Sequence, residues 1–215
     1  MPVDVKICGL STIETMDAAL DAGADLVGLV FYPKSPRHVS VEQAAMLADR
    51  ARGRARIVAL TVDADDTTIA EINRLVRPDL FQAHGNESPE RIAAIAALTA
   101  KQVIKAIKVN NAADIARAHA FSRAAALILY DAKAPETLAG ALPGGNGLAF
   151  DWTLLGHANN AAFMLSGGLT PDNVAAAIRI TGAPIVDVSS GVESAPGIKD
   201  LGLIRKFIEA AKQAR

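Results

Sequence analysis

Short β-branched apolar runs alternate with longer helical patterns along the whole 215-residue chain, and this alternation restricts the possible folds more than any other feature. Eight of the runs have the length and composition of buried parallel strands. They are Val3–Ile7, Leu26–Phe31, Arg56–Val62, Leu80–Ala83, Gln102–Ile107, Ala125–Tyr130, Ala161–Leu165 and Pro184–Val188. Each predicted strand is followed by a stretch with a helical pattern.

Helix-start signals lie between several of these strands. Ser11-Thr12-Ile13-Glu14 is typical of a capping box, in which a hydroxyl and a carboxylate satisfy free backbone N–H groups at the start of a helix. The other signals are Ser40 before Val41–Arg52, Ser88-Pro89 before Glu90–Leu98, and Thr170-Pro171 before Asp172–Ile180, the last two with proline at the first helical position.

Strand and helix in strict alternation require right-handed crossovers and a parallel sheet, which is either an open doubly wound sheet or a closed barrel. An open sheet would usually carry a GxGxxG phosphate loop after its first strand, but this chain has Lys6-Ile7-Cys8-Gly9-Leu10 there. Its glycines instead cluster after the seventh and eighth strands. We therefore predict an α/β fold, a (β/α)8 TIM barrel that forms a single domain over residues 1–215, with Pro135–Gly147 as a loop over the barrel mouth.

Composition excludes several other classes of protein. With 51% hydrophobic residues the chain is not disordered, and with a net charge of −1 it lacks the basic surface that binds nucleic acid or an anionic membrane. Cys8 is the only cysteine, so an intramolecular disulfide is impossible. No apolar stretch reaches the roughly 18 residues of a membrane span, and the N-terminus does not resemble a signal peptide. We expect a cytoplasmic protein without nucleic-acid or membrane partners.

A cysteine and an aspartate mark the ends of two predicted strands. In a barrel, polar residues at the C-terminal strand ends converge on one mouth. Cys8 there can act as a base if nearby positive charge stabilises its thiolate, and Asp131, after an apolar run, can act as a general acid. The alternatives are a small buried hydrophobe for Cys8 and a helix cap or surface carboxylate for Asp131.

Arg37 and His84 follow the second and fourth strands. Arg37 lies on the proline-stiffened segment Tyr32–Arg37 and can aim its guanidinium at a substrate carboxylate in bidentate fashion, although a solvated loop arginine is the alternative. His84 is a candidate substrate contact or a hydrogen-bonded structural residue.

Two neighbouring loops have the composition of a phosphate site. Glycines without a Cβ and small hydroxyl residues let the backbone approach an anion, and barrels commonly bind phosphate after their last two strands. The candidate phosphate ligands are Gly167, Gly168, Ser189, Ser190 and Gly191. The alternative is that the glycines only serve tight turns.

No metal, cofactor or hydrolase motif accompanies these residues. The remaining histidines, His38, His119 and His157, are not spaced as metal ligands, and CxxC and GxSxG motifs are missing from the sequence. We therefore expect a site that works without a metal or a cofactor on a small phosphorylated molecule.

Seven ordered segments resemble the phosphoribosylanthranilate isomerase family. They are Lys6–Gly9, Gly28–Arg37, Gln82–Gly85, Leu129–Asp131, Gly144–Gly147 with Phe150–Trp152, Leu165–Leu169, and Asp187–Glu193. The chain departs from the family pattern at Ala83, Tyr130 and Asn146, none of which is a catalytic position.

The resemblance implies a cofactor-free Amadori rearrangement, an aldose–ketose isomerisation that forms the third step of the tryptophan branch from chorismate. The substrate would be N-(5-phosphoribosyl)anthranilate and the product 1-(2-carboxyphenylamino)-1-deoxyribulose 5-phosphate. By the same resemblance, Cys8 matches the general base, Asp131 the general acid and Arg37 the arginine facing the anthranilate carboxylate. Gly168 and Ser189 to Gly191 match the phosphate site.

Two other hypotheses remain open from the residues alone. One keeps the enzyme class but uses an aminoimidazole ribotide or another ribulose phosphate as substrate. The other is a non-catalytic barrel that binds a phosphorylated ligand, since fold alone does not determine function. The sequence also leaves the oligomeric state between a monomer and a weak homodimer.

Overall fold

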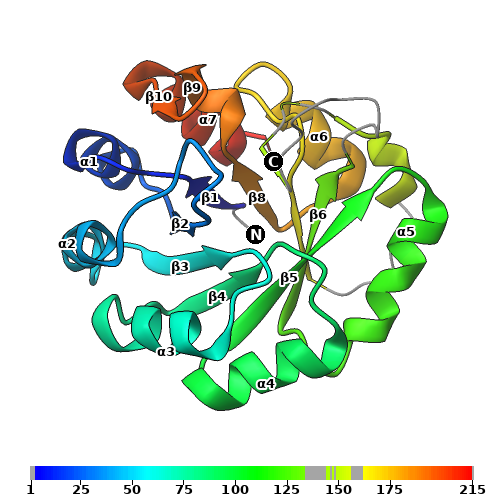
Figure 1. The fold of residues 1–215 in the computed structure, drawn as a ribbon. Helices are drawn as coiled ribbons and strands as arrows, with labels where there is room; N and C mark the ends of the chain where they lie inside the picture. The colour runs from blue at the N-terminus through cyan, green and yellow to red at the C-terminus, as the bar shows by residue number, and fades with distance from the viewer. Residues whose placement is uncertain (1–2, 134–143, 146, 148, 156–161, 215) are drawn as a thin grey trace.

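Eight parallel strands close into a barrel in the computed structural model, which describes residues 3–133, 144–145, 147, 149–155 and 162–214. Each strand pairs with the next, and β8 pairs with β1 to complete the ring (Figure 1). The strands are β1 (Asp4–Cys8), β2 (Leu26–Phe31), β3 (Arg56–Thr61), β4 (Leu80–Ala83), β5 (Gln102–Val109), β6 (Leu127–Ala132), β7 (Phe163–Leu165) and β8 (Ile185–Val188). The predicted TIM-barrel architecture is confirmed.

Helices surround the barrel on the outside (Figure 1). They are α1 (Ile13–Asp21), α2 (Val41–Ala51), α3 (Asp66–Leu75), α4 (Pro89–Thr99), α5 (Ala112–Ala116), α6 (Val174–Thr181) and α7 (Leu201–Lys212), with short 3-10 helices η1 (Arg117–Phe121), η2 (Trp152–Leu155) and η3 (Ser190–Val192). After η3 the chain forms a small antiparallel pair, β9 (Glu193–Ala195) and β10 (Ile198–Lys199), before it enters α7. Within the described residues, no helix is long and apolar enough to cross a membrane.

Two of the predicted helix starts are correct and two are wrong. The Ser40 and Ser88 hydroxyls cap α2 and α4, and Pro89 occupies the first turn of α4. The predicted capping box at Ser11 and Glu14 is wrong, because Thr12 is the cap of α1 and its hydroxyl exchanges hydrogen bonds with Thr15. The capping box of α1 therefore lies one residue later in the chain than predicted.

The helix predicted from Asp172 begins only at Val174, so Pro171 does not occupy its first position. The reason lies in Asn173, whose side-chain oxygen accepts from Thr170 N at 2.8 Å and whose side-chain nitrogen donates to Gly168 O at 2.9 Å. These bonds hold the residues before the helix in a turn that is tied to the glycine loop after β7.

The barrel interior changes from apolar to polar toward the C-terminal ends of the strands. Its apolar layer consists of Leu26, Val58, Leu80, Ile104, Ala106, Leu129 and Met164. Since alternate strand residues face the same side, positions two residues further along also face inward, and several of these are polar. Three predicted strand ends were too early, because β1 ends at Cys8, β5 at Val109 and β6 at Ala132. Cys8 and Asp131 therefore belong to strands rather than to loops. Of the strand predicted from Ala161, residue 161 lies outside the described residues.

Candidate active site

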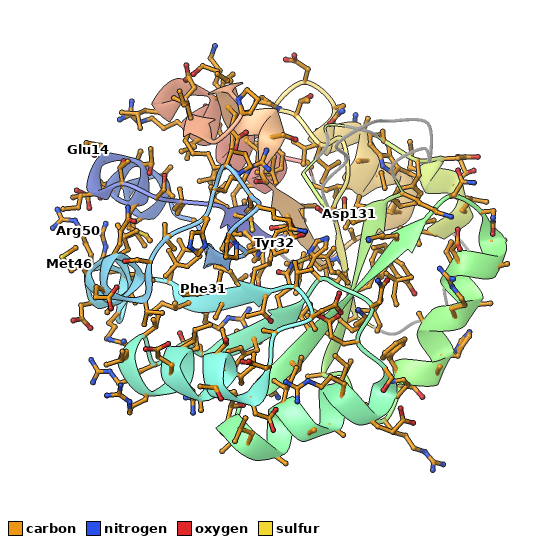
Figure 2. The ribbon with its side chains drawn as sticks, in the orientation of Figure 1. Glu14, Phe31, Tyr32, Met46, Arg50 and Asp131 are labelled. Atoms are coloured by element: carbon orange, nitrogen blue, oxygen red, sulfur yellow. The ribbon has the colours of Figure 1, made fainter. Side chains whose placement is uncertain are left out.

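One pocket opens at the C-terminal ends of the strands and encloses about 740 Å³, part of it open to solvent. Every site residue expected from the sequence lines it: Cys8, Arg37, His84, Asp131, Gly167, Gly168, Ser189, Ser190 and Gly191. In Figure 2, Asp131 and Tyr32 lie over the barrel opening, whereas Met46 and Arg50 project outward from α2. The barrel thus brings together residues that are far apart in the sequence.

Cys8 lies at the floor of this pocket and is 3% exposed. Its apolar neighbours are Val30 and Leu60. Burial raises the pKa of the Cys8 thiol above its ordinary value of 9.0, and the positive charges of Lys6 and Lys199 oppose this effect without cancelling it. The predicted positive charge near the thiol is therefore present, supplied by two buried lysines.

Lys6 pairs with Asp187 below the thiol. Its Nζ donates to Asp187 Oδ1 at 2.8 Å, and the other carboxylate oxygen accepts from Ser166 Oγ at 3.1 Å. Burial disfavours the charged form of Lys6, but the neighbouring Asp187 and Cys8 outweigh burial and raise the pKa of this lysine above 10.5. The pair therefore places a positive and a negative charge inside the barrel beside the candidate base.

Asp131 is the end of a buried hydrogen-bonded chain. Its Oδ1 accepts from the backbone N–H of Ala132 at 2.9 Å, and its Oδ2 lies 3.2 Å from His84 Nε2. His84 Nδ1 lies in turn 2.9 Å from the Gln82 side-chain amide. The Gln82 amide nitrogen can only donate, so His84 Nδ1 accepts from it and the hydrogen of the neutral imidazole lies on Nε2. His84 Nε2 therefore donates to Asp131 Oδ2, and Gln82 fixes this orientation of the ring.

Arg37 is buried and already paired with a carboxylate of the protein. Its Nε and Nη2 donate to the two oxygens of Glu193 at 2.7 and 2.8 Å, and Nη2 also donates to Gly145 O at 3.2 Å. The sequence predicted a bidentate contact of this guanidinium with a substrate carboxylate, but the edge formed by Nε and Nη2 is occupied by Glu193. The opposite nitrogen, Nη1, lies against Gly145, where a Cβ would stand only 2.7 Å away from it.

Glu193 also forms an ion pair with Lys199, which lies on β10. Lys199 Nζ donates to Glu193 Oε1 at 2.6 Å and to Ser189 O at 2.9 Å. The Ser189 hydroxyl donates to Cys8 O at 3.1 Å. Burial alone would raise the pKa of Glu193, but Arg37 and Lys199 hold it below its ordinary 4.5. The small β9–β10 pair thus connects the arginine, the loop after β8 and the end of β1.

The glycine loops have the backbone that their sequence suggested. Gly167 and Gly168 have φ of +86° and +64°, a region that favours glycine, and a Cβ at Gly167 would lie 2.5 Å from Ala132 N. A Cβ at Gly191 would overlap the carbonyl oxygen of Leu169. The backbone of the loop after β7 therefore requires glycine at positions 167 and 168, and Gly191 is required where the loops after β7 and β8 touch.

Sequence reasoning assigned no role to Lys6, Gln82, Glu193 and Lys199. The signal available for Lys6 and Gln82 was a polar residue in an otherwise apolar strand. Most of the predicted mouth loop Pro135–Gly147 lies outside the described residues, although Gly144, Gly145 and Gly147 line the pocket. Across the described ranges, no three or more His, Cys, Asp and Glu side chains are grouped so that they could hold a metal ion.

Comparisons with known proteins agree on one family. The family model for N-(5'phosphoribosyl)anthranilate (PRA) isomerase matches residues 5–210. The N-(5'-phosphoribosyl)anthranilate isomerase of Rhodopseudomonas palustris (strain BisA53) is 58% identical over 213 residues, which cover 99% of this chain and 97% of that protein.

Solved structures of the same family are also similar. A phosphoribosyl anthranilate isomerase in complex with reduced 1-(o-carboxyphenylamino)-1-deoxyribulose 5-phosphate has a TM-score of 0.85 and 36% identity, with 98% of both chains covered. Monomers generated from the dimeric isomerase of Thermotoga maritima have a TM-score of 0.84, 36% identity and the same coverage.

Proposed function

The chain belongs to the N-(5'-phosphoribosyl)anthranilate isomerase family, and we propose that it catalyses the isomerisation of N-(5-phosphoribosyl)anthranilate in tryptophan biosynthesis with Asp131 as the acid and Cys8 as the base. The product is 1-(2-carboxyphenylamino)-1-deoxyribulose 5-phosphate. The observation that carries the proposed roles is the convergence of an acid, a thiol, a cationic side chain and two glycine loops on one pocket.

Asp131 opens the ribose ring in the first step. Its protonated carboxyl transfers a proton to the ring oxygen while the C1–O bond breaks and the anthranilate nitrogen forms a double bond to C1. The carboxylate that remains accepts from His84 Nε2–H and from Ala132 N–H. His84 therefore stabilises the carboxylate that Asp131 becomes after it has given up its proton, and these two hydrogen bonds orient the carboxyl group.

Cys8 removes the C2 proton in the second step. The electron pair of the broken C–H bond forms a double bond between C1 and C2, and the positive charge on nitrogen is neutralised, which gives an enolamine. Ketonisation of the enolamine yields the product, with no net oxidation or reduction. Since β1 and β6 are separated by two strands around the ring, Cys8 and Asp131 approach the sugar from different sides. These proton transfers require no cofactor.

The loops after β7 and β8 bind the substrate phosphate. Gly167, Gly168 and Gly191 leave backbone close to the pocket, and Ser190 adds a hydroxyl. The Ser189 hydroxyl donates its hydrogen to Cys8 O, so Ser189 contributes through its position in the loop. Arg37 meets the anthranilate carboxylate with Nη1, because its Nε side is held by Glu193.

Fluorescence decay of enzymatically generated phosphoribosylanthranilate tests this proposal. We expect rapid decay with the wild type and a loss of roughly 100-fold or more in Cys8→Ser and in Asp131→Asn. Asp172→Asn, an exposed carboxylate after β7, is the matched control and should retain the wild-type rate. Wild-type protein without turnover would favour another ribotide, and turnover unchanged in both variants would remove Cys8 and Asp131 from the mechanism.

The remaining expectations concern partners and location. We propose that the small phosphorylated substrate is the main partner, that the protein acts in the cytoplasm, and that it is a monomer or a weak homodimer. The related Thermotoga maritima enzyme is described as dimeric, which supports a test by analytical ultracentrifugation over a range of concentrations.

A further inference from the structure

Lys6 is a fully buried lysine to which the proposed chemistry assigns no step. Its side chain has no exposed area, and its place inside the barrel is set by register, since Lys6 lies opposite Leu26 on β2 and Asp187 on β8. A lysine without a charged partner is costly to bury, and Lys6 has Asp187 at 2.8 Å. That pair explains how the charge is tolerated but not why a charge is there.

A glycine on β2 leaves room for the Lys6 ammonium beside the Cys8 thiol. Gly28 is the neighbour of Cys8 across the β1–β2 pair. A Cβ at Gly28 would stand 2.9 Å from Cys8 Sγ and 3.1 Å from Lys6 Nζ, so the sulfur and the nitrogen are no farther apart than the sum of these distances. Any larger residue at position 28 would push between them. The absence of a side chain there therefore brings the ammonium and the thiol together.

The charges around the thiol come from three elements. Lys6 on β1 and Lys199 on β10 are positive, and Asp187 on β8 is negative. Arg37 and Asp131 line the same pocket, while the neighbouring residues of β2 and β3, Val30 and Leu60, are apolar. Asp187 is shared, because one oxygen faces Lys6 and the other accepts from Ser166. The electrostatic environment of the sulfur is thus a balance between two positive groups, Lys6 and Lys199, and one negative group, Asp187.

We propose that Lys6 is a positioning residue that stabilises the thiolate of Cys8, and that Asp187 both orients this lysine and limits its effect. The inference rests on the proposed role of Cys8 as the base. This proposal makes a prediction that a purely structural role for Lys6 does not make. Removing the positive charge of Lys6 and removing the negative charge of Asp187 must shift the pKa of Cys8 in opposite directions.

The single cysteine makes the test direct. The ultraviolet absorbance of the thiolate is followed during a pH titration of wild type, Lys6→Met and Asp187→Asn, with Cys8→Ser as the blank that subtracts tyrosine ionisation. Lys105→Met is the matched control, because Lys105 is also a buried lysine paired with a buried carboxylate, Glu87, at 2.7 Å. It reports the effect of losing a buried ion pair away from the thiol.

In Lys6→Met the pKa of Cys8 should rise by roughly 1–3 pH units, as expected for loss of an adjacent opposite charge. In Asp187→Asn it should fall, since the amide still accepts from Lys6 but no longer opposes the thiolate. Lys105→Met should leave it unchanged. Shifts in the same direction in Lys6→Met and Asp187→Asn, or no shift in either, would overturn the proposal.

If Lys6→Met does not fold, Asp187→Asn tests the proposal by itself. An unchanged or higher pKa of Cys8 in Asp187→Asn contradicts the proposal. If Lys6→Met folds and the wild type turns over, its isomerase activity should be low at neutral pH and recover as the pH is raised, which a distorted site would not do. The titration uses no substrate. If the pKa of Cys8 shifts in opposite directions in Lys6→Met and Asp187→Asn but the wild type does not turn over the substrate, the proposed function is overturned. The electrostatic coupling of Lys6 to Cys8 is then still supported.

Discussion

Replacing Glu193 with glutamine should destabilise the protein and weaken substrate binding together. The carboxylate is buried and accepts four hydrogen bonds, two from Arg37, one from Lys199 and one from the backbone N–H of Gly197. Glutamine has nearly the same shape but only one acceptor oxygen and no charge. The substitution therefore leaves two buried cations to share a single neutral partner.

The expected magnitude follows from the loss of one partner of a buried ion pair, which costs about 3–5 kcal/mol. We expect roughly 3 kcal/mol, the lower end, because the glutamine oxygen still accepts one bond and Lys199 keeps its bonds to Ser189. For a domain of this size that corresponds to a melting temperature lower by about 6–12 °C. Arg37 also loses its fixed orientation, so KM should rise roughly tenfold or more, with a smaller change in kcat.

Circular dichroism melting and steady-state kinetics measure both effects. Glu71→Gln, an exposed glutamate on α3, is the control and should match the wild type within about 0.5 kcal/mol. Binding of an aniline analogue that lacks the carboxylate should be equal in Glu193→Gln and wild type, because Arg37 has nothing to grip in that ligand. A Glu193→Gln protein with wild-type melting and wild-type KM would refute the idea that this carboxylate holds Arg37.

Two more predictions concern stability. Burial alone would raise the pKa of Glu87 and of Glu193, but their cationic partners hold both pKa values below the ordinary 4.5. The two carboxylates therefore stabilise the fold fully above pH 4.5, and this stabilisation is lost as the pH falls through the lowered pKa values. Urea denaturation between about pH 6 and pH 3 should show the loss of stability, and a smaller loss in Glu193→Gln. A stability that does not change across this range would contradict the assignment. Gly191→Ala should lower stability by more than about 2 kcal/mol and raise KM, because its Cβ overlaps Leu169 O, whereas Gly202→Ala in α7 should have a small effect on urea denaturation and on KM.

Local patterns in the sequence were sufficient for the architecture. The number of strands, their order and the caps at Ser40 and Ser88 follow from apolar periodicity and from hydroxyls that bond to N–H groups three residues away. Cys8 and Asp131 were found because each ends an apolar run, which places them at the barrel mouth in any (β/α)8 fold. The misplaced start of α6 shows the limit, since Asn173 bonds to both Thr170 and Gly168 and so delays the helix.

Only the tertiary structure decided which charged groups of the site pair with one another. Lys6 and Asp187 are 181 residues apart and Arg37 and Glu193 are 156 apart, and their pairing depends on the closure of β8 onto β1. A shift of one residue in that register would turn Lys6 out of the barrel, which no local pattern reports. The sequence by itself therefore determined which residues reach the mouth, and the closed barrel determined which charges they face, because strand register and not sequence distance sets their neighbours.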